Sequence, residues 1–177
     1  MGRDAFIEGL AKSKKEQPEL KRFADYYYST DLPIPDFELV EHGPRIADAW
    51  FPDDPDAAQQ FLIFAENHDG SVFAIWDDGP IVYLASEYEG TSVIANSVAE
   101  LLGLVAYGSD TFTIDIQYAD KEEWQGCEEE SEGLFALRTW LQENLQIVVP
   151  ESPREVIRKA RSQHPDLVQW IESRRSN

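Results

Sequence analysis

The chain has 177 residues, of which 42% are hydrophobic and 12% aromatic, enough to bury the core of one globular domain. It carries 34 acidic residues against 15 Lys and Arg, which gives a formal net charge of −19. This surplus of negative charge excludes a passive nucleic-acid binder, because phosphate contacts require cations, and it disfavours adhesion to anionic membranes.

The charges are not evenly spread along the chain. Residues 23–153 contain three basic and 27 acidic side chains, whereas residues 1–22 and 154–177 contain six basic side chains each. Two compatible interpretations stay open. The basic ends are helices that lie on the acidic body and reduce its self-repulsion, or the acidic middle presents a face to a basic partner.

Cysteine usage and the first residues bear on location. Cys127 is the only cysteine, so we expect neither an internal disulfide nor a zinc-binding framework. The N-terminus leads into a charged segment without the apolar stretch of a signal peptide, and no later apolar run approaches the roughly 18 residues of a membrane span. We therefore expect a cytoplasmic protein that is not associated with a membrane.

The N-terminal segment, residues 1–30, is predicted to be helical. Apolar residues recur in it at helical spacing, at Phe6, Ile7 and Leu10 and again at Leu20, Phe23 and Tyr27. Pro18 can occupy the first turn of the second helix, and the prolines of segment 32–35 end it. Segment 52–56, with two prolines and three aspartates, is interpreted as a loop.

The middle of the chain predicts an antiparallel meander. Three short apolar runs are separated by two Asp-Gly turns, and a fourth extended piece follows. The runs are 61–65, 71–76, 81–85 and 92–95, and the turns are Asp69-Gly70 and Asp77-Asp78-Gly79. Segment 111–118 alternates strictly between apolar and polar residues and could form an edge strand, and the acidic run 122–132 is interpreted as a solvated loop.

Helix signals flank the meander on its C-terminal side. Ser97 and Glu100 form a capping box before an apolar stripe, and Ser152 and Glu155 form a second one. Leucines at positions 134, 137, 141 and 145 indicate an amphipathic helix within a helical C-terminal segment, residues 131–174. A sheet flanked by helices at both ends predicts a single α+β domain spanning residues 1–177.

Tests for metal-binding and catalytic motifs argue against an enzyme. Asp53, Asp54 and Asp56 are close in sequence but do not fit the calcium-loop pattern, and the histidines, His42, His68 and His164, are far apart.

Cys127 precedes three glutamates that disfavour its thiolate, and no nucleophile elbow or phosphate loop is present. Paired carboxylates for glycoside hydrolysis remain open, because a chain with so many acids places some at a suitable distance by chance. We expect a non-enzymatic domain without metal or other cofactor.

Aromatic residues among carboxylates mark a candidate protein-binding site. Trp76 precedes Asp77 and Asp78, and Tyr88 lies between Glu87 and Glu89, both at ends of predicted strands where the rings would be partly exposed. Such aromatic anchors ringed by acids suit a partner rich in Lys and Arg, although ordinary loop composition is the alternative. Tyr26–Tyr28 and Trp50-Phe51 are interpreted as packing residues. The predicted protein-binding residues are Asp69, Trp76, Asp77, Asp78, Glu87, Tyr88 and Glu89.

The segment 61–108 resembles the SUKH superfamily, which includes cell-wall-synthesis regulators and bacterial immunity proteins. The elements that carry the resemblance are Asp69-Gly70, Trp76, the strand Pro80 to Leu84, and the Ser-capped helix Ser97 to Val105. The resemblance implies a non-enzymatic α+β domain whose sheet or groove binds another protein. In bacteria that protein is often a toxin, commonly a basic nuclease, which an acidic inhibitor would attract. The alternative is a housekeeping regulatory or scaffold protein with an endogenous partner, and the oligomeric state stays open.

Overall fold

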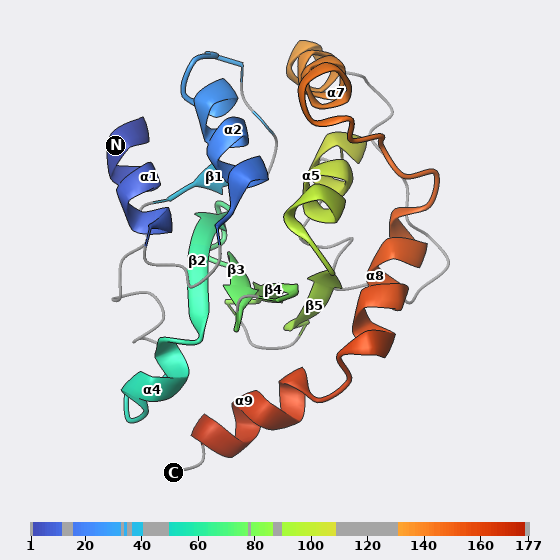
Figure 1. The fold of residues 1–177 in the computed structure, drawn as a ribbon. Helices are drawn as coiled ribbons and strands as arrows, with labels where there is room; N and C mark the ends of the chain where they lie inside the picture. The colour runs from blue at the N-terminus through green and yellow to red at the C-terminus, as the bar shows by residue number, and fades with distance from the viewer. Residues whose placement is uncertain are drawn as a thin grey trace.

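The computed structural model describes residues 2–11, 16–32, 34, 37–40, 50–77, 79–86, 90–108 and 131–175. The helices within these ranges are α1 (Arg3–Leu10), α2 (Pro18–Tyr27), α4 (Pro55–Ala58), α5 (Val98–Tyr107), α7 (Glu132–Leu145), α8 (Pro153–Gln163) and α9 (Leu167–Arg175). The strands are β1 (Glu38–Leu39), β2 (Phe61–Glu66), β3 (Val72–Trp76), β4 (Ile81–Leu84) and β5 (Ser92–Ala95). The predicted α+β class is confirmed (Figure 1).

The five strands form one antiparallel sheet in the order β1-β2-β3-β4-β5, so the predicted meander is confirmed. Both predicted Asp-Gly turns close hairpins. In the first, the Gly70 N–H donates to the Asn67 carbonyl at 3.1 Å, and in the second the Gly79 N–H donates to the Trp76 carbonyl at 2.9 Å. Gly70 has a φ of 84°, in the left-handed region that glycine adopts without strain.

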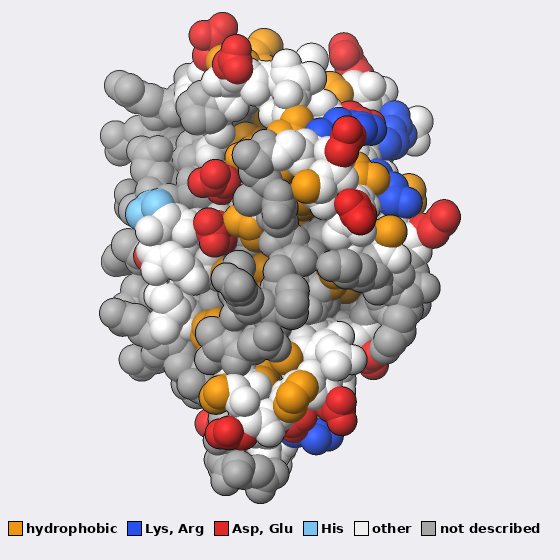
Figure 2. Space-filling model, turned by 90° about the vertical axis from the view of Figure 1, so that its left-hand side faces the viewer, with side chains coloured by type: hydrophobic (Ala, Val, Ile, Leu, Met, Phe, Trp, Pro, Cys, Tyr) orange, Lys and Arg blue, Asp and Glu red, His pale blue; other side chains and the backbone are white. Residues whose placement is uncertain are grey.

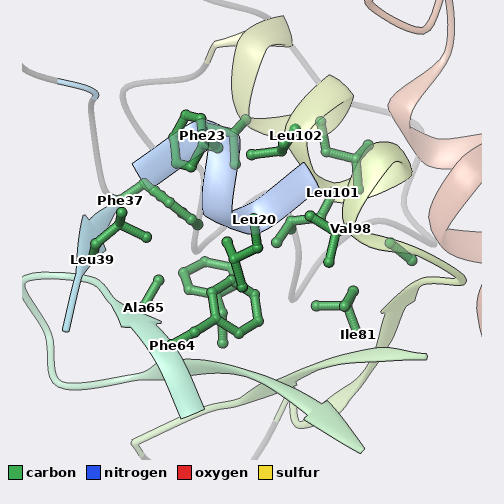
Figure 3. Close-up of a cluster of buried hydrophobic side chains, with 14 of the residues drawn as sticks. Leu20, Phe23, Phe37, Leu39, Phe64, Ala65, Ile81, Val98, Leu101 and Leu102 are labelled. Carbon is green, nitrogen blue, oxygen red and sulfur yellow. The ribbon is translucent and has the colours of Figure 1, made fainter. Parts of the chain in front are cut away.

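Helices cover both faces of the sheet, which explains why its strands are apolar on both sides. Every residue of β3 and β4 is buried. On one face, Phe73 and Ile75 belong to a core that also contains residues of α1, α2, α5 and α7. Figure 3 shows side chains of α2 and α5 pointing toward Phe64 and Ile81 of the sheet. On the other face, Ala74 and Trp76 pack against α4 and α9. The period-two alternation is therefore present in β3 and β4, but it selects between two cores rather than between a core and solvent. It is interrupted in β2, where Phe64 and Ala65 lie in the same core at a register shift.

The serines of both predicted capping boxes cap their helices. The Ser97 Oγ accepts a hydrogen bond from the Glu100 N–H at 3.2 Å, and the Ser152 Oγ accepts one from the Glu155 N–H at 3.4 Å. The Glu100 carboxylate accepts from the Asn96 N–H at 2.8 Å, one residue before the capping position. These bonds satisfy backbone donors that the first turn of a helix leaves free.

The basic C-terminal helices lie on the body of the domain, in agreement with the first interpretation of the charge pattern. Helix α8 packs along β5 at the edge of the sheet (Figure 1). Its Arg161 donates to the Ser92 hydroxyl at 3.0 Å, and Lys159 lies 3.7 Å from the Glu100 carboxylate. No helix in the described part of the chain combines the length and apolar character needed to cross a bilayer.

Segment 52–56 is predicted to be a loop, but its last two residues belong to a helix, so the prediction is wrong for them. Pro55–Ala58 forms the one-turn helix α4, because Asp54 caps it and Pro55 occupies its first position. The Asp54 carboxylate accepts from the Ala57 N–H at 3.0 Å and also from Arg174 of α9 at 3.2 Å. The possible edge strand at 111–118 and most of the acidic run 122–132 lie outside the described residues.

Candidate functional site

The predicted binding residues do not form one cluster. Asp69 lies in the β2–β3 turn and Asp77 in the β3–β4 turn, and successive turns of a meander lie at opposite ends of the strands. The register agrees, since Phe61 pairs with Trp76 at one end of β2 and Glu66 with Val72 at the other. The remaining predicted residues lie outside the described part of the chain: Asp78, Glu87, Tyr88 and Glu89.

Trp76 is not the partly exposed anchor that the sequence predicts. It is only 9% exposed and belongs to a cluster of aromatic rings on the α4 and α9 side of the sheet. Its ring lies 6.5 Å from that of Phe61, nearly parallel, and 5.6 Å from that of Trp170. Helix α9, about ninety residues further along the chain, supplies the covering ring. Trp76 is therefore a core residue.

Asp69 and Asp77 are exposed residues of the two hairpin turns. The Asp69 carboxylate accepts a hydrogen bond from the Ser71 N–H at 2.7 Å, and the Asp77 N–H donates to the Gln60 carbonyl at 2.8 Å. Asp77 has a φ of 47°, a left-handed conformation that Asp tolerates in turns. Both residues thus shape their turns.

The sequence did not reveal a pocket of about 460 Å³ at the end of the sheet that holds the Asp69 turn. It lies where the C-terminal end of α2, the segment after it, β1 and the β2–β3 turn meet. Aromatic, acidic and apolar side chains share its wall. Its lining residues are Tyr27, Tyr28, Thr30, Asp31, Leu32, Ile34, Phe37, Glu38, Glu66, Asn67 and His68.

Two of the pocket's carboxylates belong to a strand pair. Glu38 of β1 lies directly opposite Glu66 of β2 in the antiparallel register. Directly opposed residues have Cβ atoms about 4.5–5.5 Å apart, and two like charges at that distance destabilise the pair. The next pair, Leu39 and Ala65, is buried in the core and holds the two strands in this register. The core thus fixes two acidic residues as a directly opposed pair at the pocket.

The carboxylates of the pocket have no Lys or Arg partner among the described residues. In the part of the chain that the structure describes, no Lys or Arg forms an ion pair with Asp31, Glu38 or Glu66. Glu38 also affects a neighbouring phenol. Burial raises the pKa of the Tyr27 phenol, the negative charge of Glu38 raises this pKa further, and a hydrogen bond with the Leu39 backbone lowers it.

The inner wall of the pocket is anchored to the core. Asn67 is only 4% exposed, and its amide nitrogen donates to the Tyr83 hydroxyl at 3.3 Å. Its amide oxygen accepts from the N–H groups of Asp69 at 3.2 Å and Ser71 at 3.1 Å. On the opposite wall, the rings of Tyr27 and Tyr28 meet edge to face, with centroids 5.2 Å apart and planes at 86°. The pocket is therefore held between a fixed turn and packed rings.

Figure 2 shows one side of the molecule, where Asp and Glu side chains are dispersed over the surface rather than gathered into one patch. Within the described ranges, no group of three His, Cys, Asp or Glu side chains is arranged to hold a metal ion. The pocket combines three carboxylates, those of Asp31, Glu38 and Glu66, with two tyrosine rings.

Comparison with known proteins does not assign this site. No family model, no curated protein and no solved structure matches the chain. Its function must therefore be argued from the site and the charge of the molecule.

Proposed function

We propose that this chain is a non-enzymatic protein-binding domain of the immunity type, which binds a basic, nuclease-like toxin domain. The observation that carries the proposal is the pocket at the β1–β2 edge, where Asp31, Glu38 and Glu66 have no cationic partner among the described residues and lie beside Tyr27 and Tyr28. Carboxylates and aromatic rings in one concave site suit the Lys and Arg side chains of a protein partner.

The charge of the whole chain supports the same partner. A net charge of −19 attracts a basic protein over a distance and repels nucleic acid. The chain would therefore compete with nucleic acid for the basic surface of a nuclease. The resemblance of residues 61–108 to the SUKH superfamily supports the immunity role in particular.

A toxicity-rescue assay tests this role. The chain is co-expressed with the toxin domains encoded in the genes beside its own, and growth is compared with that of cells expressing each toxin alone. We expect the chain to restore growth and to co-purify with one of these domains. Growth that stays arrested whether or not the chain is present would overturn the immunity role.

A further inference from the structure

We infer that the pocket at the β1–β2 edge receives the side chain of an arginine residue from the partner. This inference rests on the proposed function, because it takes the partner to be a basic protein, and it assigns a defined contact to the pocket.

The shape of the pocket suits an extended side chain that ends in a flat group. Its volume of about 460 Å³ lies within the roughly 300–1,000 Å³ of sites that enclose small organic groups. Ile34 and Phe37 supply apolar surface for a methylene chain, and both are buried. The rings of Tyr27 and Tyr28, set at 86° to each other, form a corner. A planar cation that faces one of these rings gains a cation–π contact.

The carboxylates favour guanidinium over ammonium. Glu38 and Glu66 lie opposite each other across the strand pair, and Asp31 also lines the pocket. A guanidinium presents five N–H donors in a plane, so it can bridge two carboxylates while one of its faces rests on a tyrosine ring. A lysine ammonium is a strongly hydrated point charge that gains less from such stacking.

Three described cations form ion pairs away from the pocket. Arg3 donates to Asp25, Arg174 lies 3.2 Å from Asp54, and Lys159 lies 3.7 Å from Glu100. Each of these pairs joins a terminal helix to the body of the domain or to its neighbouring helix. The repulsion between Glu38 and Glu66 is left without such compensation in the described residues, and an arriving cation relieves it.

The first test is an NMR titration with three short peptides that differ at one residue, acetyl-Gly-X-Gly-amide with X as arginine, lysine or citrulline. Citrulline has the shape of arginine without its charge. We expect the arginine peptide to shift the backbone amides of Tyr28, Asn67 and His68, with a Kd in the millimolar range because a single side chain makes the contact. The citrulline peptide should bind at least about tenfold more weakly, and the lysine peptide should fall between the two.

The outcomes of the titration decide the inference. Citrulline binding as tightly as arginine would overturn it, because charge would then play no part. Lysine binding as tightly as arginine would overturn the choice of arginine, and shifts confined to residues outside the pocket would overturn the site. A shift of the pocket amides by arginine alone, or by arginine ahead of lysine, would support it.

A pair of matched variants separates the site from general charge. Glu66→Gln removes one carboxylate of the strand pair, and Glu151→Gln removes the same charge from an exposed position on the α7–α8 connection. Glu66→Gln should weaken binding of the arginine peptide about three- to tenfold, while Glu151→Gln should leave it unchanged. Because Glu66→Gln also relieves the repulsion with Glu38, its melting temperature should be equal to that of the unmodified chain or higher. Unchanged arginine binding in Glu66→Gln would contradict the inference.

The test of the pocket and the test of the function can fail independently. Rescue from the toxin that persists in Glu66→Gln, together with no arginine binding in the titration, would refute the pocket and keep the immunity role. Arginine binding at the pocket without rescue by the unmodified chain would refute the immunity role and keep the pocket as a cation site.

Discussion

At the end of α5, close packing depends on the lack of a side chain at Gly108. Gly108 has a φ of 79°, and a Cβ added there would lie 2.4 Å from a methyl carbon of Leu134. Gly108→Ala should therefore lower the free energy of unfolding by about 2–4 kcal/mol, from backbone strain and from the overlap with a core leucine. Gly70→Ala is the matched control, because Gly70 also has a positive φ, 84°, but open space around it. Gly70→Ala should lower the free energy of unfolding, measured by urea denaturation, by only about 1–2 kcal/mol. Equal losses in the two variants would show that Leu134 moves away freely.

Deprotonation of the Tyr27 phenol should lower the stability of the domain at alkaline pH. Burial, followed by the charge of Glu38, raises the pKa of Tyr27 above its value in the unfolded chain. A raised pKa stabilises the fold fully below the unfolded value, about pH 10, and this stabilisation is lost as the pH rises through the folded value. Stability measured by urea denaturation should therefore fall above about pH 10. The fall should be smaller in Tyr27→Phe, and an identical fall in both proteins would contradict the assignment.

At the scale of the elements, capping explains which helices the sequence predicts well. Ser97 begins α5 with a side-chain hydrogen bond to the Glu100 N–H at 3.2 Å, and the pattern Ser-x-x-Glu is visible in the sequence. Ser97→Ala should lower the free energy of unfolding by about 0.5–2 kcal/mol, whereas Ser97→Asp, which keeps an acceptor, should lose much less. Thermal melts of the two variants test this. Losses of the same size would mean that the Ser97 hydroxyl does not act as the cap.

Elements whose form depends on distant partners were predicted less well. The hairpins at Asp69-Gly70 and Asp77-Gly79 follow from local turn chemistry, and the structure confirms them. Trp76 was expected to be partly exposed, because nothing in the nearby sequence shows that Trp170 of α9 covers it. The sequence does not predict the short helix α4, because two prolines among aspartates are typical of a loop. In the structure, Pro55 is instead the first helical residue after the Asp54 cap.

The candidate pocket illustrates the same limit. Its residues come from three separate stretches of the sequence, 27–34, 37–38 and 66–68, and no motif joins them. Only the register of β1 against β2 places Glu38 opposite Glu66. A two-residue strand such as β1 leaves no clear pattern in the sequence, so this meeting of charges could not be predicted. The sequence predicts a binding role for Asp69 in the neighbouring turn, but Asp69 does not line the pocket.

At the scale of the whole molecule, net charge should control how fast a partner arrives. A formal charge of −19 should steer a basic protein, so the association rate constant should fall steeply between low and physiological salt. The dissociation rate constant should change much less, because contacts at the interface are short-ranged. Stopped-flow measurements with the partner from the rescue assay test this. An association rate that does not depend on salt would show that long-range charge plays no part in the encounter.

The position of α8 has a consequence for how the chain behaves when it is shortened. Helix α8 packs along β5, which is the last strand of the sheet among the described residues, and so covers Ser92–Ala95. A chain cut before Pro153 would lose that cover and would also lose the contacts of α9 with Phe61 and Trp76, which would open the aromatic cluster. Such a fragment should self-associate into β-rich oligomers at concentrations at which the intact chain stays dispersed.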